Sequence, residues 1–297
     1  MNGRERGFLL LTSHLGDPDR KVLTVAQLRV LTQAVTGAEI PHGDGDVTEQ
    51  DLMALGFNRS SARRIVELLS GEEQLNWYLQ EGKRFGLQPI TRVSTGYPLI
   101  LRKRLGLDSP GCLWTKGDIA LLQKPLIALV GSRDLYEPNL EFAYEAGRQA
   151  ALQGYTLVSG NARGADKTAQ RACLEHGGTV ISVVADALKE HTAKDRVLYL
   201  SEDGFDLPFS AQRALSRNRV IHCLADVVLV AQCTYGKGGT WDGTIQNLEN
   251  NRSAVFCFDD GSKAAIELTQ RGAQTLKLND LRCLADLRPQ QNLFDQT

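Results

Sequence analysis

Ser159-Gly160-Asn161-Ala162-Arg163-Gly164-Ala165-Asp166 is the stretch that decides the fold. It follows the apolar run Tyr155 to Val158, which predicts a strand, and it precedes Lys167 to Glu175, which predicts a helix ending at Gly177-Gly178. The loop therefore lies between the carboxyl end of a strand and the amino end of a helix. Free backbone N–H groups at such a junction favour anions, although the same junction also occurs without a ligand.

Two further glycine junctions repeat this arrangement. The run Leu126 to Val130 is apolar at every position, as expected of a strand buried inside a parallel sheet, and it ends at Gly131-Ser132-Arg133. A second predicted strand, Val227 to Ala231, leads to Gly236-Lys237-Gly238-Gly239. Because ligands bind beyond the carboxyl ends of the strands in such sheets, we expect the three junctions to share one crevice.

The rest of the chain continues the alternation of strands and helices. Further strands are expected at 180–185, 197–201, 254–258 and 275–278, and helices at 139–153, 213–224, 244–250 and 264–270. This pattern predicts an α/β fold with a doubly wound, mostly parallel, extended Rossmann-like sheet. Neither Gly-x-Gly-x-x-Gly nor a Walker A loop is present, which disfavours NAD binding and ATP hydrolysis.

The chain divides into three parts in this interpretation. Residues 1–86 are expected to form a small helical domain, with helices near 24–35, 48–56 and 58–69 and a polar loop over 37–46. The order helix, Leu55-Gly56-Phe57, helix resembles a helix-hairpin-helix or sterile-alpha-motif module, but any packed helical hairpin shares it. Residues 87–280 form the Rossmann-like domain, and 281–297 a polar C-terminal tail.

Composition narrows the class of protein. The chain has 297 residues, of which 42% are hydrophobic, and it has a formal net charge of −1. No apolar run reaches the length of a membrane span, so we expect no membrane association and a cytoplasmic location. A nearly neutral chain argues against a uniformly basic duplex-coating protein. Basic residues nevertheless cluster locally, as in Arg102-Lys103-Arg104 and around Asn218.

Cysteines and histidines are dispersed and give no metal-binding pattern. There is no Cys-x-x-Cys pair and no His-Glu-x-x-His motif, so we expect neither a metal nor a cofactor. His222 is expected to be a packed helix residue rather than a base. The six cysteines are expected to be buried, reduced thiols: Cys112, Cys173, Cys223, Cys233, Cys257 and Cys283.

In order and spacing, several motifs resemble the DNA-processing protein A (DprA/Smf) family. They are Tyr97-Pro98, Gly117-Asp118, Gly131-Ser132-Arg133, the stretch 159–166, Ser201-Glu202, Arg217 to Ile221 and the turn 236–239. The resemblance implies a Rossmann-like core that binds single-stranded DNA, forms homodimers and helps load a RecA-type recombinase. It therefore implies a recombination mediator and no catalytic residues.

Carried onto this chain, the resemblance and the glycine loops give a set of candidate contacts. The DNA- or phosphate-binding candidates are Ser132, Arg133, Gly160, Arg163, Gly164, Arg217, Asn218, Arg219, Lys237, Gly238 and Gly239. Asn218 is expected to order its loop. Arg217 and Arg219 either bind phosphate together or pair with Glu202 or Asp203 to hold the loop.

Three departures from the family pattern make this a short, divergent member. Ala214-Leu215 stand where the family usually has Phe-Pro, so an aromatic platform for bases is missing. Trp241, in an altered glycine turn, either supplies that stacking surface or covers the sheet. Only a short polar segment follows Leu287-Arg288-Pro289, so we do not expect the winged-helix module that many relatives carry.

An alternative function uses the same crevice for a nucleotide. Related Rossmann-like phosphoribohydrolases carry Pro-Gly-Gly-x-Gly-Thr-x-x-Glu, and matching Gly243-Thr244 to its Gly-Thr places Asn247 at the glutamate. Without that carboxylate the natural general acid or base is absent. Asp166 is expected to cap a helix or to pair with an arginine. A nucleotide sensor or a phosphoribohydrolase-like enzyme is therefore the alternative to a non-enzymatic DNA binder.

Overall fold

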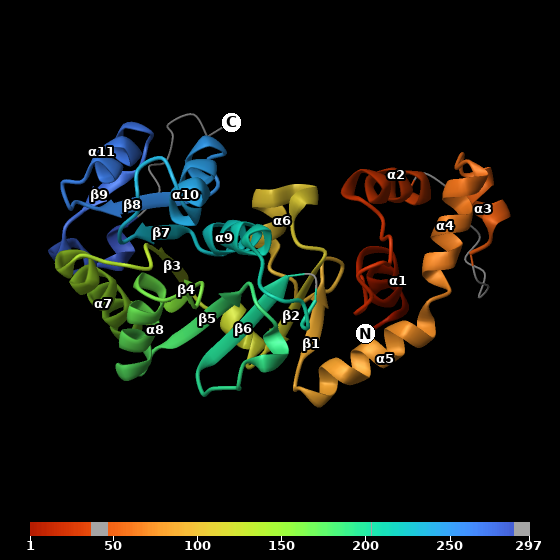
Figure 1. The fold of residues 1–297 in the computed structure, drawn as a ribbon, viewed down its shortest axis with the longest axis horizontal. Helices are drawn as coiled ribbons and strands as arrows, with labels where there is room; N and C mark the ends of the chain where they lie inside the picture. Colours follow the sequence, from red (N-terminus) through yellow and green to blue (C-terminus); the bar gives the residue numbers. More distant parts are fainter. Residues whose placement is uncertain (37–46, 203, 288–297) are drawn as a thin grey trace.

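A computed structural model describes residues 1–36, 47–202 and 204–287, so the loop expected over 37–46 and the candidate partner Asp203 lie outside the described residues. The described residues form one nine-stranded sheet with helices on both faces and a helical lobe beside its β1 edge (Figure 1). The strands are β1 (Gln88–Thr91), β2 (Cys112–Lys116), β3 (Leu126–Val130), β4 (Thr156–Ser159), β5 (Thr179–Val184), β6 (Val197–Glu202), β7 (Val227–Val230), β8 (Ala254–Phe258) and β9 (Gln274–Leu276).

Eleven α-helices are described in these residues. They are α1 (Gly3–Thr12), α2 (Val25–Thr36), α3 (Glu49–Ala54), α4 (Arg59–Leu69), α5 (Glu72–Arg84), α6 (Leu99–Leu105), α7 (Glu137–Leu152), α8 (Ala165–Glu175), α9 (Ala211–Leu224), α10 (Gly239–Glu249) and α11 (Lys263–Gln270). Short 3₁₀ turns occupy Gly106–Asp108, Ile119–Gln123, Leu188–Glu190, Leu278–Arg282 and Leu284–Asp286.

The strand order places a topological switch point in the middle of the sheet. The order is β1-β2-β6-β5-β4-β3-β7-β8-β9, and all neighbours from β6 to β9 are parallel. From β3 the chain moves outward through β4, β5 and β6, and then returns through α9 to β7 on the other side of β3. In open α/β sheets the ligand crevice lies at such a reversal, so the loops after β3 and β7 mark the expected site.

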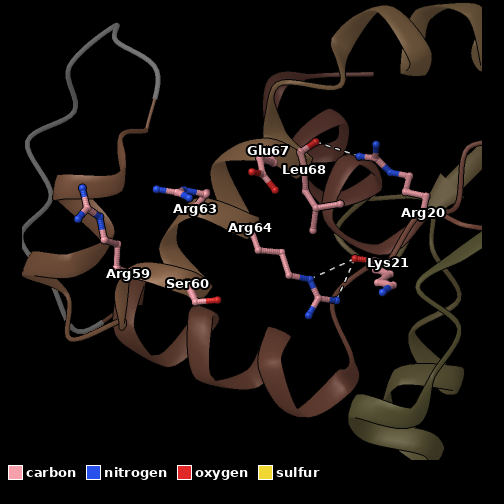
Figure 2. Close-up of a pocket in the computed structure, with 8 residues that line it drawn as sticks. All are labelled: Arg20, Lys21, Arg59, Ser60, Arg63, Arg64, Glu67 and Leu68. Carbon is pink, nitrogen blue, oxygen red and sulfur yellow. Dashed lines mark hydrogen bonds between the residues drawn. The ribbon is translucent and has the colours of Figure 1, made fainter.

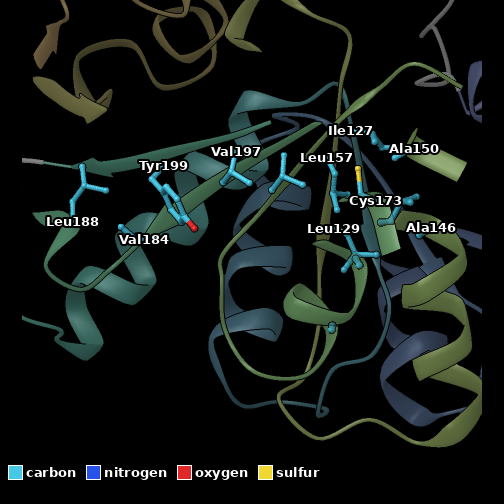
Figure 3. Packing of buried hydrophobic residues seen from close by; sticks show 14 of the residues in the cluster. Ile127, Leu129, Ala146, Ala150, Leu157, Cys173, Val184, Leu188, Val197 and Tyr199 are labelled. Carbon is cyan, nitrogen blue, oxygen red and sulfur yellow. The ribbon is translucent and has the colours of Figure 1, made fainter. Parts of the chain in front are cut away.

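Alternating side chains on the central strands build two cores. Ile127 and Leu129 of β3 belong to the cluster covered by α7 and α8, part of which Figure 3 shows. Ala128 and Val130 belong to the opposite cluster, which α6, α9, α10 and α11 cover. This two-sided burial explains why β3 is apolar at every position. The prediction of a doubly wound, mostly parallel sheet is confirmed.

An aromatic group joins the helical lobe to the sheet. Tyr78 of α5 stacks on Phe205, with ring centroids 4.4 Å apart, and meets Trp114 of β2 edge-on at 5.3 Å. The Tyr78 hydroxyl donates a hydrogen bond of 2.7 Å to Asp206. Because Leu9 and Leu75 also belong to the core under α7 and α8, the lobe and the sheet share a buried interface.

Differences from the expected elements have local causes. The sheet begins before residue 126, because β1 and β2 add two antiparallel strands at the edge next to β6. Helix α10 begins at Gly239 rather than Thr244, since Thr240 and Trp241 pack its glycine-rich first turn against the sheet. In the expected polar tail, Leu281, Leu284 and Leu287 are buried in the core, while 288–297 lie outside the described residues.

Candidate nucleic-acid interface

A cavity of about 460 Å³ lies at the switch point. Its lining comes from four places: the loop after β3, the loop between β4 and α8 with the start of α8, the glycine turn before α10, and the amino-terminal half of α9 with the segment leading into it. Seven predicted site residues line this crevice, namely Ser132, Arg133, Arg217, Asn218, Lys237, Gly238 and Gly239. The structure thus brings together residues separated by about a hundred positions in the sequence.

Hydrogen bonds between the loops fix the shape of the crevice. The Ser132 N–H donates to the Gln232 carbonyl at 2.9 Å, which ties the loop after β3 to the loop after β7. Thr240 Oγ1 donates to the Gly131 carbonyl at 3.1 Å. Asn218 Nδ2 donates to the Gly239 carbonyl at 2.9 Å and so joins α9 to the glycine turn. This bond agrees with the loop-ordering role expected of Asn218.

Gly160 and Gly164 shape the crevice from behind rather than lining it. A Cβ at Gly160 would lie 1.3 Å from Arg217 Nη1, so this glycine makes room for the guanidinium. Gly164 has φ +83, and a Cβ there would lie 2.4 Å from the carbonyl oxygens of both Ser132 and Arg133. Only glycine combines this backbone conformation with such close approach, which sets the distance between the β4 and β3 loops.

Arg217 forms the floor of the crevice. Its side chain is largely buried, Nη1 donates to the Val183 carbonyl at 3.3 Å, and it lies 3.8 Å from Asp166 Oδ2. Arg217 thus pairs with Asp166 on α8, while the alternative partner Asp203 lies outside the described residues. Glu202 instead accepts a hydrogen bond of 3.0 Å from the Ser216 hydroxyl.

Asp166 orders the loop between β4 and α8, and its burial changes its pKa. Oδ2 accepts a hydrogen bond of 3.1 Å from the Ala162 N–H, so the carboxylate orders the loop that enters α8. Burial raises the pKa of Asp166 to about 6, while Arg217 and the loop amides oppose that rise. Of the two expected roles, pairing with an arginine is present, whereas Gly164 occupies the N-cap of α8 and Asp166 bonds the preceding loop instead of capping the helix.

The open side of the crevice carries features that suit phosphate. Arg133 and Lys237 are exposed at its edges. Gly238 is the N-cap of the 11-residue helix α10 and, among the described residues, makes no side-chain hydrogen bond to its first turn. Because Gly238, Gly239 and Thr240 line the crevice, the amino terminus of α10 lies at the crevice. Helix amino termini and guanidinium groups both stabilise phosphate oxygens.

An aromatic side chain that the motif comparison missed lies on the lining. Phe209 is 56% exposed and belongs to the crevice lining, just before Ser210, the residue that caps α9. The signal in the sequence is Phe209, eight positions before Arg217, whereas the family pattern has its aromatic residue only three positions before that arginine. Trp241, by contrast, is 8% exposed and packs in the core, so it covers the sheet.

Two arginine candidates lie away from the lining. Arg163 is exposed and pairs with Asp134 at 2.7 Å at the neighbouring loop surface. Arg219 is two positions from Arg217 on α9, about 200° around the helix, and its Nη2 contacts Ser216 Oγ at 3.4 Å. The structure does not bring Arg163 or Arg219 into the crevice, and their contact with DNA stays a prediction.

Asn247, which stands at the position of the phosphoribohydrolase glutamate, has a structural role in this protein. Asn247 is fully buried, its Nδ2 contacts His222 Nδ1 at 3.0 Å, and its Oδ1 accepts from the Ser253 N–H at 3.0 Å. Burial lowers the pKa of His222 to about 4, so the imidazole is neutral at pH 7. His222 and Asn247 therefore connect α9 to α10 beneath the surface.

The remaining composition-based expectations have mixed outcomes. Five cysteines are buried free thiols, but the expectation of burial is wrong for Cys283. It joins two short 3₁₀ turns and is exposed, while Leu281 and Leu284 on either side of it take the core positions. Burial raises the pKa of Cys173 to about 11. In the part of the chain that the structure describes, no cluster of His, Cys, Asp and Glu is placed to hold a metal. None of the described helices is long and apolar enough to cross a membrane.

The fold and the crevice define a Rossmann-like protein with a cavity at its switch point, edged by Arg133 and Lys237. Residues 88–284 match the family model described as DNA recombination-mediator protein A. Over 208 residues the chain is 30% identical to DNA processing protein DprA of Bacillus subtilis, covering 64% of this chain and 68% of that one. The chain belongs to the DNA recombination-mediator protein A family.

Two solved structures extend the comparison. The DprA structure from Streptococcus pneumoniae has a TM-score of 0.73 at 25% identity, covering 96% of this chain and 99% of that one. The DNA processing protein A structure from Helicobacter pylori, described for its single-stranded DNA binding mode, has a TM-score of 0.57 at 24% identity and covers 68% of this chain and 97% of that one. The second likeness supports the fold alone.

Proposed function

We propose that this protein binds single-stranded DNA in the crevice at the switch point and acts in DNA processing and recombination. The observation that carries the proposal is the lining itself, in which Arg133, Lys237 and the α10 amino terminus surround a cavity with the exposed ring of Phe209 on it. Phosphates would lie on the cations and amides, and a base would stack on Phe209.

Membership of the family supports the same proposal. The relative from Helicobacter pylori is described as binding single-stranded DNA, and the family model is named for recombination mediation. We further propose that the protein is a cytoplasmic homodimer that helps load a RecA-type recombinase, as the family resemblance implies. These parts extend beyond the crevice and need their own tests.

The proposal assigns no catalytic residue to the crevice. Asn247 is buried under the glycine turn and holds Ser253 and His222, so it offers no carboxylate to a bound nucleotide. Incubation with nucleoside monophosphates should therefore release no free base above a buffer control. Release that Glu202→Gln abolishes would favour the phosphoribohydrolase-like alternative instead.

The direct test compares ligands and one aromatic substitution. In gel-shift titrations at two salt concentrations, single-stranded DNA should bind more tightly than duplex DNA or a mononucleotide. Phe209→Ala should weaken single-strand binding about tenfold, the effect expected of one stacked base. Leu99→Ala is the matched control, because Leu99 is 70% exposed and lies on α6, outside the crevice lining. Equal binding by Phe209→Ala and Leu99→Ala would remove the base platform from the proposal.

A further inference from the structure

The helical lobe carries a second concentration of positive charge, outside residues 88–284 that the family model matches. A groove of about 700 Å³ runs beside α4, and Figure 2 shows the side chains around it. Its lining is mostly cationic: Arg20, Lys21, Arg59, Ser60, Arg63, Arg64, Glu67 and Leu68. We refer to this lining as the basic groove.

Charge is not balanced within the basic groove. Five of its side chains are Lys or Arg, and Glu67 is the one acidic residue of this lining in the described part of the chain. Arg59 and Arg63 share one further carboxylate, that of Glu49, at 3.9 and 3.3 Å. Counting Glu49 and Glu67, a formal excess of three positive charges remains, on a chain whose net charge is −1.

Backbone carbonyls hold two of the arginines, whereas the side chains of Arg59 and Arg63 make only an exposed, shared ion pair with Glu49 among the described residues. Arg20 donates to the carbonyls of Leu10 and Leu68, and Arg64 donates to the carbonyls of Lys21 and Val22. Neutral carbonyls fix these two guanidinium groups without cancelling their charge. Arg59 and Arg63, with side chains 76% and 58% exposed, project from one face of α4 a single turn apart. They are positioned to meet a ligand.

The chemistry of the basic groove favours phosphate over other anionic surfaces. Four of its five cations are guanidinium groups, which bind phosphate oxygens in a bidentate way. Ser60, in the first turn of α4, adds a hydroxyl donor near the positive end of an 11-residue helix. Leu68, the one apolar residue of this lining in the described chain, is buried, so the groove presents no exposed apolar residue of this lining to a lipid bilayer or an amphipathic peptide.

We propose that the basic groove is a second binding site for the phosphodiester backbone of nucleic acid, separate from the crevice and without base recognition. The inference rests on the proposed function, since a strand that is held in the crevice and is long enough to reach the lobe would bring its own phosphates there. Contacts to phosphate alone carry no sequence information, so the groove would add affinity and salt dependence to long strands.

The test removes the two exposed arginines from the full-length protein. The variant Arg59→Gln/Arg63→Gln is compared with Arg84→Gln/Arg271→Gln, which removes the same charge from two other exposed helix-end ion pairs. Probes are labelled oligothymidylates of about 6 and about 40 nucleotides, chosen to fill one site or to reach beyond it, together with a 40-base-pair duplex and vesicles rich in phosphatidylserine.

The expected result is specific to length and to phosphate. The groove variant should bind the long strand about tenfold more weakly and flatten its log affinity against log salt by about 1.4, at about 0.7 per lost contact. Its affinity for the short strand, and both affinities of the control, should match the wild type. A parallel loss on the duplex would show that the site also accepts double-stranded backbone.

Other outcomes contradict the inference in distinguishable ways. Unchanged long-strand and duplex binding by the groove variant would overturn the second site while leaving the crevice intact. An equal loss on short and long strands would mean that the arginines act through the crevice. Loss of vesicle binding alone would assign the groove to a membrane surface. Wild-type protein that binds neither oligonucleotide would overturn both the inference and the proposed function.

Discussion

Gly160 and Gly164 act through the space that they leave to their neighbours. Gly160 admits the guanidinium of Arg217 beneath the loop, and Gly164 admits the carbonyl oxygens of the loop after β3. From the sequence, both glycines are candidates for contact with DNA. The structure gives them the task of holding Arg217 and Ser132 in place, which a glycine pattern in the sequence does not distinguish from direct binding.

The substitution Gly160→Ala should destabilise the protein by about 1–3 kcal/mol, as overpacking of a dense site does. The new Cβ would displace Arg217 and leave Asp166 buried without its cation. Urea unfolding followed by circular dichroism measures the effect. Gly96→Ala is the control, because a Cβ there would meet no described atom within 4 Å. Equal stabilities for the two variants would show that Arg217 has another position open to it.

Asp166 should make DNA binding depend on pH. Its pKa is raised to about 6 by burial, so the carboxyl becomes increasingly neutral as the pH falls from 7 to 5, and a negative charge leaves the crevice. Single-strand affinity should rise about three- to tenfold over this interval, the size expected for one partly screened charge. Fluorescence anisotropy at constant ionic strength measures it. Asp166→Asn should abolish the pH dependence, and a variant that keeps it would assign the titration to another group.

The sequence motif does not show which of its arginines reach the crevice. Arg217 and Arg219 look alike in the motif, but one faces the crevice floor and the other lies about 200° around α9. Phe209 shows the opposite case: it lies outside the motif, yet it lines the crevice because the segment that leads into α9 borders the cavity. Such relations depend on tertiary packing and have no fixed spacing in the chain.

At the scale of elements, helices α9 and α10 are joined by a buried polar network. His222 of α9, Asn247 of α10 and Ser253 exchange hydrogen bonds beneath the glycine turn. Burial is the larger cause that lowers the pKa of His222 to about 4, and the charge of Arg252 contributes. Because the buried site favours the neutral imidazole, protonation of His222 destabilises the contact between α9 and α10.

This network predicts a loss of stability in mild acid. A histidine whose folded-state pKa lies below its usual 6.5 contributes stability above pH 6.5, and that contribution is lost as the pH falls toward 4. Between pH 7 and pH 5 the unfolding free energy of the wild type should fall by about 2 kcal/mol more than that of His222→Gln. Urea unfolding at both pH values measures this difference between the two proteins. Both proteins contain Asp166, whose contribution has the opposite sign, so it cancels in the comparison. Parallel pH profiles for the two proteins would contradict the assignment.

Contact between α5 and the sheet gives a second prediction at this scale. Tyr78 packs between Trp114 and Phe205, so Tyr78→Ala should cost about 3–5 kcal/mol, as for other large aromatic truncations. Trp77→Ala, one position away and 52% exposed, should cost much less. Thermal unfolding compares the two. A small effect of Tyr78→Ala would mean that the lobe and the sheet are stable independently of this contact.

The sequence predicted elements best where burial is uniform. Strands β3 and β8 have the predicted bounds, because Pro125 and Gly131 delimit the apolar run of β3 and the polar residues Ser253 and Asp259 delimit that of β8. The edge strand β1 and its neighbour β2 were not predicted, since proline and glycine interrupt their surroundings and each strand depends on antiparallel pairing. The first turn of α10 was predicted as a loop, because its glycines have low helix propensity. In the structure the packing of Trp241 in the core outweighs that propensity, and the turn is helical.

Across the whole molecule, charge separation matters more than net charge. A chain with a formal charge of −1 holds a crevice edged by Arg133 and Lys237, and a basic groove on its helical lobe. Local clusters of this kind bind polyanions while the remaining surface stays nearly neutral. The sequence indicated this separation but could not locate it, because the clusters assemble from distant segments.

The salt dependence of single-strand binding tests the central claim most directly. Short oligothymidylate is titrated by fluorescence anisotropy from about 50 to about 200 mM salt into the wild type, Arg133→Gln/Lys237→Gln and the control Arg84→Gln/Arg271→Gln. If the crevice holds the strand, the first variant should bind at least tenfold more weakly and its slope of log affinity against log salt should be smaller by about 1.4, with the control unchanged. Wild-type affinity and slope in the crevice variant would contradict single-strand binding at the switch point.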